Sequence, residues 1–217
     1  MPGAPLNIAD IRKDYKLAAL DESSVGNDPI VFFTKWFSEA EAAQITEINA
    51  MTLATVDHNA VPHARIVLLK GLDRADFVFF TNYDSAKGKE INANPHAALV
   101  FFWKELERQV RIEGTIEKIP GNESDIYFNS RPAGSRIGAW ASPQSQEIAD
   151  RNILDLNYAK YEEEFSKVEI PRPSHWGGYK VTPNRIEFWQ GRSSRMHDRI
   201  LFTKNGNGGW DRSRLAP

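Results

Sequence analysis

The sequence contains no cysteine among its 217 residues. Disulfides, thiolate zinc sites, iron–sulfur ligation and cysteine nucleophiles are therefore excluded. Long hydrophobic runs are also lacking: "AALVFFW" (97–103) falls far short of the roughly 20 apolar residues that a membrane-spanning helix needs. The N-terminus shows no basic segment followed by an apolar one, so no secretory signal is predicted. The expected location is cytoplasmic, with no membrane partner.

Basic charge is not in excess either. The chain has 27 Lys and Arg against 29 Asp and Glu, for a net charge of −2, whereas a non-specific nucleic-acid binder usually carries a basic excess. The five histidines have no H-x-x-x-H spacing and no accompanying acidic cluster, which predicts no metal site. The Walker A, G-x-G-x-x-G and G-x-S-x-G motifs are absent as well, so a P-loop, a Rossmann site and that kind of hydrolase are not indicated.

What is present suits one ordinary globular domain, because 41% of the residues are apolar and 26% are charged. Residues 1–28 are polar and weakly patterned, and we expect a flexible arm with one helical turn around "DIRKDYKL" (10–17). Asp28 and Pro29 have the residue types of an N-cap and a first helical position. They predict an amphipathic helix over 29–49, at the start of a single domain that spans 29–217.

Strand character dominates the rest of the chain. Val, Ile, Phe and Thr are enriched in short runs, which is typical of strands. The predicted strands are 51–56, 61–70, 77–82, 97–104, 109–119, 177–190, 195–205 and 210–215. Short helices are expected at 85–94 and within 122–165, the longest of them over 145–165. The fold class predicted is mainly β with α (α+β), a largely antiparallel sheet that closes into a barrel with helices packed outside.

The segment "FWQGRSSRMHDR" (188–199) concentrates positive charge in a slightly acidic chain. If 195–199 is a strand, Arg195, His197 and Arg199 lie on the same face. Such a face suits an anion or an electron-rich ring better than an apolar core. A solvated outer face is the alternative that the residues alone leave open.

Three further segments gather groups that suit a phosphate. Arg65 and Lys70 flank the apolar strand "ARIVLLK" (64–70), although an offset of five places them on opposite faces unless a bulge intervenes. Lys87 stands at a predicted helix N-terminus, which is a ready anion site. "YFNSRPAGSRIGAWASPQS" (127–145) carries Tyr127, Arg131, Ser135 and Arg136 around a turn. The residues alone leave a simpler explanation open for each segment. From spacing alone, charges that end a buried strand are the favoured explanation for Arg65 and Lys70. An ordinary surface helix would explain Lys87, and helix capping and surface polarity would explain 127–145.

Taken together, these pieces resemble the pyridoxamine 5′-phosphate oxidase family. "RIVLLK", "FFTN", "ERQVRIEG", "YFNSRP", "SRIGAWASPQS", "WGGYKV", "IEFWQG", "RMHDR" and the terminal "RLAP" stand in the order and spacing of that family, from "IRKDY" to Pro217. The resemblance implies an FMN-binding split β-barrel that works as a homodimer with FMN at the subunit interface. It also implies oxidation of pyridoxamine or pyridoxine 5′-phosphate to pyridoxal 5′-phosphate. O2 would reoxidise the flavin to give hydrogen peroxide, and the amine would also release ammonia.

Residue by residue, the resemblance assigns three sets of positions. The cofactor-binding set is Arg65, Ile66, Val67, Leu68, Leu69, Lys70, Phe80, Thr81, Lys87, Gln109, Gln144, Ser145, Trp189 and Arg199. The substrate-binding set is Arg12, Tyr15, Lys70, Tyr127, Arg131, Ser135, Arg195 and His197, with Arg12 and Tyr15 in an N-terminal lid. Arg195 and His197 are also the expected catalytic residues, Arg195 stacking on the pyridine ring.

The chain departs from the family pattern at one position. The pattern near 85–87 reads Ser-Arg-Lys, and here Ala86 replaces the arginine. One charge-assisted hydrogen bond contributes about 1.5–3 kcal/mol, so the sequence predicts weaker retention of FMN.

Three other functions remain open at this stage. A split-barrel flavin reductase or FMN carrier would share the cofactor positions but would leave Tyr127, Arg131, Ser135, Arg195 and His197 unexplained. A non-catalytic pyridoxal phosphate carrier would use the same phosphate anchors without reducing a flavin. A nucleic-acid-binding barrel is disfavoured by the net charge and the scattered aromatic residues.

Overall fold

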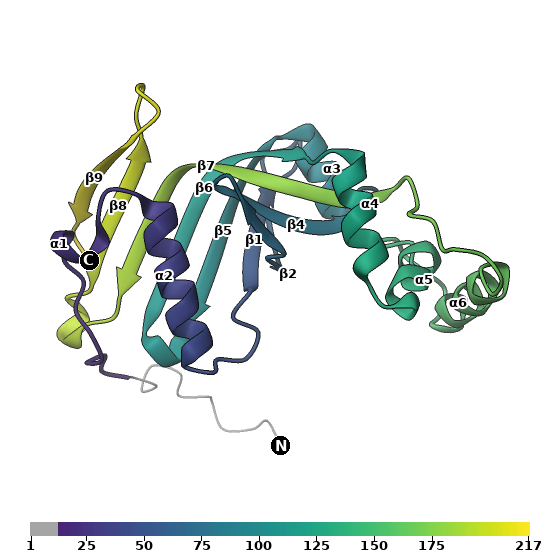
Figure 1. Cartoon of the computed structure of the whole chain (residues 1–217), viewed down its shortest axis with the longest axis horizontal. Coiled ribbons are helices and arrows are strands. Elements are labelled where there is room, and N and C mark those ends of the chain that lie inside the picture. The colour runs from purple at the N-terminus through teal and green to yellow at the C-terminus, as the bar shows by residue number, and fades with distance from the viewer. Residues whose placement is uncertain (1–12) are drawn as a thin grey trace, which may run out of the picture. The chain divides into compact units, whose positions relative to one another are not determined.

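The computed structural model describes residues 13–217. Over this range the chain forms six α-helices, nine β-strands and two short 3₁₀ helices (Figure 1). The helices are α1 (Glu22–Val25), α2 (Pro29–Ala42), α3 (Ala86–Ala93), α4 (Gly121–Ser130), α5 (Ala133–Ala141) and α6 (Asn152–Glu164). The strands are β1 (Ala50–Val56), β2 (Pro62–Leu68), β3 (Gly71–Asp73), β4 (Asp76–Asn82), β5 (His96–Trp103), β6 (Arg108–Lys118), β7 (Trp176–Gln190), β8 (Asp198–Lys204) and β9 (Trp210–Leu215). The 3₁₀ helices are η2 (Lys104–Leu106) and η3 (Ser193–Arg195).

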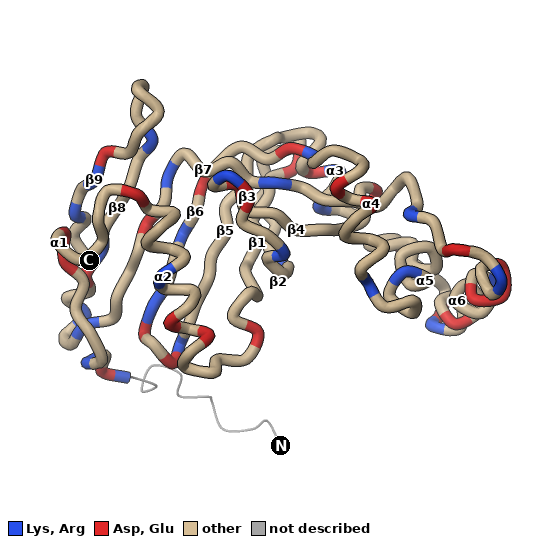
Figure 2. The backbone as a smooth tube through the Cα atoms, viewed as in Figure 1, with Lys and Arg blue, Asp and Glu red and all other residues tan. Residues whose placement is uncertain are grey.

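The chain divides into two compact units. Unit 1 contains residues up to Ile48, Phe102–Arg111 and Ile186–Pro217, and unit 2 contains Asn49–Phe101 and Ile112–Arg185. Strands β5, β6 and β7 therefore have residues in both units. Acidic and basic residues are interspersed along the elements of each unit (Figure 2), as the near-neutral composition leads one to expect.

In unit 1, helix α2 packs against strand β7. Asp28 caps the helix by accepting hydrogen bonds from the Ile30 and Val31 N–H groups, and Pro29 occupies the first turn. The rings of Phe32 and Trp36 lie 4.8 and 5.3 Å from that of Phe188 on β7. Phe188 in turn meets Phe202 on β8, and β8 pairs antiparallel with β9. Burial of these large rings stabilises this unit.

Helix α2 is shorter than the predicted 29–49 because a Schellman motif ends it. The Ile45 N–H bonds to the Ala40 carbonyl and the Gln44 N–H to the Glu41 carbonyl. Gln44 has the left-handed backbone, with φ of 54°, that this motif requires. Glycine usually fills that position, so nothing in the sequence marked the end of the helix.

In unit 2, the strands run in the order β2-β1-β5-β6-β7-β4-β3. β1 pairs antiparallel with β2 and β5, and β4 pairs antiparallel with β3 and β7. Beyond the strands, α4 and α5 pack in an apolar cluster formed by Phe128, Ile137, Ile170 and Trp176. Tyr158 and Tyr161 of α6 and Phe165, which follows it, cover that cluster.

Most predicted elements agree with the structure, and the differences have local causes. The longest helix was expected over 145–165 but begins at Asn152, because Ser145 has a positive φ of 67° and residues 146–151 are not helical. The predicted turn around 10–17 lies partly outside the described residues, and 13–17 are not helical; the short helix of this region is α1. Strand β3, only three residues long, was not predicted.

Candidate active site

A cavity of about 320 Å³ in unit 2 is lined by residues of, or next to, β2, β4, α3, α4 and β7. We call it the anion pocket. The predicted site residues that line it are Ile66, Val67, Leu68, Lys70, Phe80, Thr81, Lys87, Tyr127, Arg131 and Gln144. Asn82 and Trp176 line it too and were not predicted. Trp176 begins the "WGGYKV" motif, and that tryptophan was the signal available.

Lys70 reaches the anion pocket because strand β2 ends at Leu68. Lys70 lies in the link between β2 and β3, and its N–H donates to the Val78 carbonyl of β4 at 2.8 Å. Arg65 does not line this pocket and pairs with Glu90 instead, so the structure does not bring Arg65 and Lys70 together.

Arg131 contributes a partly buried guanidinium to the anion pocket. Its guanidinium carbon lies 4.5 Å from the centre of the Trp176 ring. Its Nη1 atom is buried and has no hydrogen-bond partner in the described chain. Burial lowers the pKa of Arg131 from its usual value, but arginine stays protonated in proteins. A buried donor without an acceptor is costly, so this atom is poised for an anionic ligand.

Aromatic side chains hold the wall on which Arg131 rests. Tyr127 stacks on Phe80 with ring centres 3.8 Å apart, and Phe80 lies 5.6 Å from Trp176 in near-parallel orientation. Because β4, α4 and β7 each contribute one ring, the stack ties three elements together. The position of the arginine is thereby fixed before any ligand arrives.

Lys87 supplies a third cation, after Lys70 and Arg131, from the first turn of α3. Its ammonium donates to Gln144 Oε1 at 3.0 Å and lies 3.3 Å from Ser85 Oγ. Burial, and then the charge of Arg65, lower the pKa of Lys87. Thr81 Oγ1 donates to the same Gln144 oxygen at 3.1 Å, so three predicted cofactor residues form one hydrogen-bonded group.

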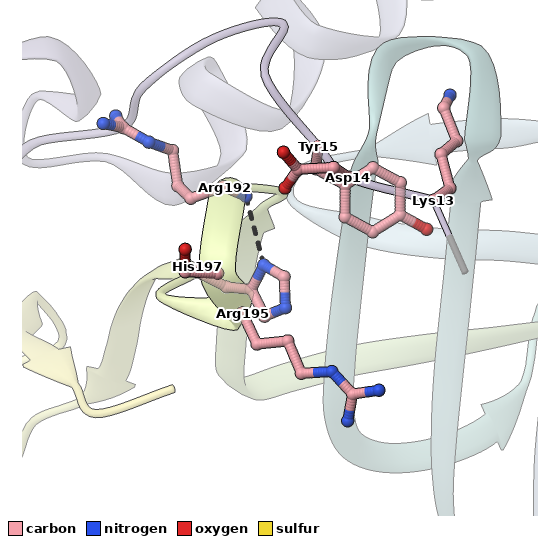
Figure 3. Close-up of a pocket in the computed structure, with 7 residues that line it drawn as sticks. Lys13, Asp14, Tyr15, Arg192, Arg195 and His197 are labelled. Carbon is pink, nitrogen blue, oxygen red and sulfur yellow. Dashed lines mark hydrogen bonds between the residues drawn. The ribbon is translucent and has the colours of Figure 1, made fainter. Parts of the chain in front are cut away.

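A cavity of about 470 Å³ in unit 1 is lined by Lys13, Asp14, Tyr15, Arg192, Ser194, Arg195 and His197 (Figure 3). We call it the arginine–histidine pocket. Tyr15, Arg195 and His197 were predicted here, whereas Lys13, Asp14, Arg192 and Ser194 were not named as site residues. The His197 ring is 4.7 Å from Trp189 and 6.0 Å from Tyr15.

The tautomer of His197 is set by the main chain. The Arg192 N–H donates to His197 Nδ1 at 3.1 Å, while the Arg192 side chain points away from the imidazole (Figure 3). Nδ1 must be unprotonated to accept this bond, so the neutral ring carries its proton on Nε2. His197 therefore offers a hydrogen-bond donor at Nε2.

The prediction that 195–199 is a strand is wrong for its first part. Ser194 and Arg195 have left-handed backbones, with φ of 56° and 60°, and β8 begins only at Asp198. The simple alternation of faces therefore does not group Arg199 with Arg195 and His197. Arg199 instead donates to Glu187 at 2.8 and 3.1 Å and to the Ala216 carbonyl at 2.9 Å, and the Glu187 hydrogen bonds raise its pKa.

The other predicted residues line neither of these two pockets. Arg65 makes an ion pair with the buried Glu90, Nη2 to Oε2 at 2.7 Å, and also contacts Thr55. Burial alone would raise the pKa of Glu90, but the hydrogen bonds from Thr55 and Arg65 lower it. Leu69 is buried, Gln109 and Trp189 are half-buried, and Ser135 and Ser145 are exposed. Arg12 lies outside the described residues.

Comparison with known proteins decides the family. A family model described as pyridoxamine 5′-phosphate oxidase matches residues 37–164. The chain belongs to the pyridoxamine 5′-phosphate oxidase family. A second model of this family, described as the pyridoxine 5′-phosphate oxidase C-terminal dimerisation region, matches residues 176–217.

Relatives of the family match along almost the whole chain. A Ralstonia nicotianae protein named pyridoxine/pyridoxamine 5′-phosphate oxidase 1 is 57% identical over 211 residues, 97% of this chain and 99% of the relative. A Trichormus variabilis protein named pyridoxine/pyridoxamine 5′-phosphate oxidase is 56% identical, covering 97% and 98% of the two chains.

Two solved structures share the fold. PhzG from Burkholderia lata, in complex with tetrahydrophenazine-1-carboxylic acid, has a TM-score of 0.87 at 27% identity, covering 94% of this chain and all of the other. An FMN-binding, pyridoxamine 5′-phosphate oxidase-related protein from Nostoc punctiforme has a TM-score of 0.69 at 17% identity, covering 85% and 97%. The predicted fold class, a mainly β split barrel with peripheral helices, is confirmed.

Proposed function

We propose that this protein is an FMN-dependent oxidase that converts pyridoxamine 5′-phosphate and pyridoxine 5′-phosphate to pyridoxal 5′-phosphate. The observation that carries the proposal is the 57% identity, over nearly the full length of both chains, to a relative named for these substrates. The two pockets support it, because each supplies groups that such a reaction needs.

The anion pocket fits ligands that carry a phosphate. Arg131 presents a buried donor that has no partner among the described residues, and Lys70 and Tyr127 add further donors to the same pocket. Arginine binds phosphate by two parallel hydrogen bonds, so Arg131, Lys70 and Tyr127 would hold the substrate phosphate. The phosphate is remote from the reacting carbon of the substrate. Binding energy gained at the phosphate can therefore be used to orient that carbon for the reaction.

The same pocket contains groups that suit FMN. Lys87, Thr81 and Gln144 form a hydrogen-bonded group with one cationic member, and Ile66, Val67 and Leu68 supply apolar and main-chain surface. These residues would hold the cofactor. When bound, FMN accepts a hydride from the substrate and is reoxidised by O2 with release of hydrogen peroxide.

The arginine–histidine pocket suits the ring of the substrate. The exposed guanidinium of Arg195 can stack on a pyridine ring and offset negative charge that develops on it. His197 presents its Nε2 proton as a donor to an oxygen or nitrogen of the substrate, because Nδ1 is occupied by the Arg192 N–H. We therefore assign His197 a hydrogen-bonding role in the neutral state of the ring.

An N-terminal lid and a homodimer complete the proposal. Residues 13–17 bring Tyr15 to the arginine–histidine pocket, which supports the lid assigned to the arm. The match of residues 176–217 to a dimerisation region supports a homodimer, and light scattering on the purified protein tests that. No helix within residues 13–217 is long and apolar enough to cross a membrane. The cytoplasmic location remains a prediction.

An anaerobic half-reaction tests the function. The FMN-loaded protein is mixed with pyridoxine 5′-phosphate without O2, and the flavin absorbance is followed. We expect bleaching that reverses when air is admitted. If the flavin stays oxidised on a protein that holds FMN, the oxidase assignment is wrong and a reductase or FMN carrier replaces it. If pyridoxal 5′-phosphate binds without any flavin chemistry, a carrier of that product is favoured.

A further inference from the structure

Glu107 is a buried acidic residue with no part in the function proposed above. It lies in the turn between β5 and β6, with a side chain in unit 1 that is almost completely removed from solvent, the whole residue being 4% exposed. Acidic side chains are almost never buried at this level unless their charge is paired. Its partners therefore indicate what this carboxylate is for.

All the side-chain partners of Glu107 that the structure shows lie in the N-terminal arm. Oε2 accepts hydrogen bonds from the N–H groups of Lys16 at 2.9 Å and Leu17 at 3.1 Å. Oε1 lies 3.4 Å from the ammonium of Lys13. Hydrogen bonds from N–H groups to an ionised acceptor are about twice as strong as those between neutral groups. The two oxygens of one carboxylate therefore hold residues 13–17, Oε1 at Lys13 and Oε2 at Lys16 and Leu17.

The main chain of Glu107 is fixed from the opposite side. Its carbonyl accepts from the Gly191 N–H at 2.8 Å and from Gln190 Nε2 at 3.2 Å. Its own φ of 54° is left-handed, a conformation that persists in a non-glycine residue when its surroundings enforce it. The residue thus links the arm to Gly191, where the segment carrying Arg195 and His197 begins.

Tyr15 lies directly on Gly191. A Cβ atom added at Gly191 would come within 2.7 Å of Tyr15 Cγ and 2.9 Å of Tyr15 Cβ. Tyr15 also meets Trp189 edge-on, with ring centres 5.8 Å apart. The absence of a side chain at residue 191 therefore creates the seat for the tyrosine ring.

We infer that Glu107 is a positioning residue: its carboxylate holds arm residues 13–17 so that Tyr15 is seated on Gly191 beside His197. Glu107 touches neither substrate nor cofactor in this inference and acts through Tyr15. The inference rests on the proposed function for its kinetic consequences, whereas its structural consequence, the anchoring of the arm, holds whatever the substrate is.

The first test is limited trypsin digestion of the FMN-loaded enzyme, with cleavage after Lys16 followed by mass spectrometry. We expect Glu107→Ala to speed this cleavage by about tenfold or more, because the local opening of the arm becomes easier. Glu107→Gln should protect nearly as well as the wild type, since one amide oxygen can accept both N–H bonds and only the exposed Lys13 pair is lost. Glu105→Ala, an exposed acidic neighbour in the same turn, is the matched control.

The second test is a double-mutant cycle with pyridoxine 5′-phosphate as substrate. Glu107→Ala should raise KM by about one power of ten, the size expected for loss of a charge-assisted hydrogen bond, and change kcat less. In a Tyr15→Ala background the same substitution should have almost no further effect on KM, because residues that act as one unit are not additive. With Tyr15 unchanged, Glu107→Gln should keep KM close to the wild-type value.

A third variant reaches the same seat without touching the carboxylate. Gly191→Ala should expel the Tyr15 ring and reproduce the raised KM and the faster cleavage, whereas Gly206→Ala, whose added Cβ meets nothing within 4 Å, should do neither. Additive effects of Glu107→Ala and Tyr15→Ala, or unchanged cleavage after Lys16 in Glu107→Ala, would overturn the inference. A wild-type protein that does not oxidise the substrate defeats the proposed function alone, since the digestion still decides how the arm is held.

Discussion

The anion pocket and the arginine–histidine pocket are built in opposite ways. The anion pocket takes its cations from or next to regular elements, and stacked rings on β4, α4 and β7 fix their positions. The arginine–histidine pocket takes its groups from a short left-handed segment around Ser194 and Arg195 and from arm residues 13–15. Arg131 is partly buried, with a donor that has no partner within residues 13–217, whereas Arg195 is exposed.

This difference matches two kinds of work. A phosphate keeps its charge throughout a reaction, so a rigid and partly desolvated set of donors binds it best. A reacting ring must enter, change and leave, and segments of low local stability are suited to such movement. The comparison leads us to expect that substitution of the anion-pocket cations alters binding, whereas substitution of Arg195 alters turnover.

Arg195→Ala is expected to have the largest effect. Removing one preorganised charge that acts on the reacting group costs about two to three powers of ten in kcat, while the FMN content should stay close to that of the wild type. Steady-state kinetics and the flavin absorbance of the purified variant measure the two quantities. Arg185→Ala, an exposed arginine of unit 2, is the control. Turnover that survives in Arg195→Ala would remove the assigned role of this residue and the contrast between the pockets.

Arg131→Gln should have the next largest effect, and on binding. Loss of a charge-assisted hydrogen bond of about 1.5–3 kcal/mol raises the dissociation constant for pyridoxal 5′-phosphate by about one to two powers of ten. The effect should vanish for pyridoxal without its phosphate, which makes the unphosphorylated compound an internal control. Equal weakening of both ligands would mean that Arg131 acts by supporting the Trp176 wall rather than by binding phosphate.

The sequence predicted the strands next to the anion pocket better than it predicted the backbone of the arginine–histidine pocket. Strands were predictable because runs of Val, Ile, Phe and Thr such as 77–82 and 97–104 match β4 and β5 closely. The segment before β8 was not, because nothing in "GRSSRMH" marks the positive φ of Ser194 and Arg195; serine and arginine are not residues that usually adopt it. The expectation that Arg195, His197 and Arg199 share a strand face failed for that reason.

Contacts between residues far apart in the chain could not be predicted from the spacing of residues in the sequence. Lys87 and Gln144 meet at 3.0 Å although 57 residues separate them, and Glu107 binds an arm 90 residues earlier in the chain. The resemblance to a known family named Lys87 and Gln144 but not Glu107. Glu107 stands in the "ERQVRIEG" motif, but the motif does not indicate which groups its carboxylate binds, so only the folded chain reveals them.

Ala86→Arg should strengthen the binding of FMN, with a smaller effect than the two substitutions above. Ala86 is exposed at the first position of α3, beside Lys87, so a new guanidinium there would be partly screened by solvent. We expect the dissociation constant for FMN to fall by up to about tenfold, less than a fully desolvated charge-assisted bond would give. Fluorescence titration of the apoprotein measures it. Ala93→Arg adds the same charge at the other end of the helix and should change nothing; an equal gain there would indicate a general charge effect.

The smallest effect expected is a dependence of FMN affinity on alkaline pH. The pKa of Lys87 lies below its usual 10.5 because of burial and then of Arg65. The ammonium therefore loses its proton earlier than an ordinary lysine as the pH rises. A bound phosphate favours the charged form and raises that pKa, so binding above the free-site pKa requires proton uptake and weakens with increasing pH.

Lys87→Arg isolates this contribution, because arginine keeps its charge throughout the range in which lysine titrates. FMN titrations between about pH 7.5 and 10 should show a decline in affinity for the wild type that is reduced in Lys87→Arg. Lys89→Arg, an exposed lysine of the same helix, should keep the wild-type decline. If all three proteins lose affinity in parallel, the titrating group lies elsewhere. The fixed charge of the anion pocket would then rest on Arg131 and Lys70, and the contrast with the arginine–histidine pocket would depend on those two residues alone.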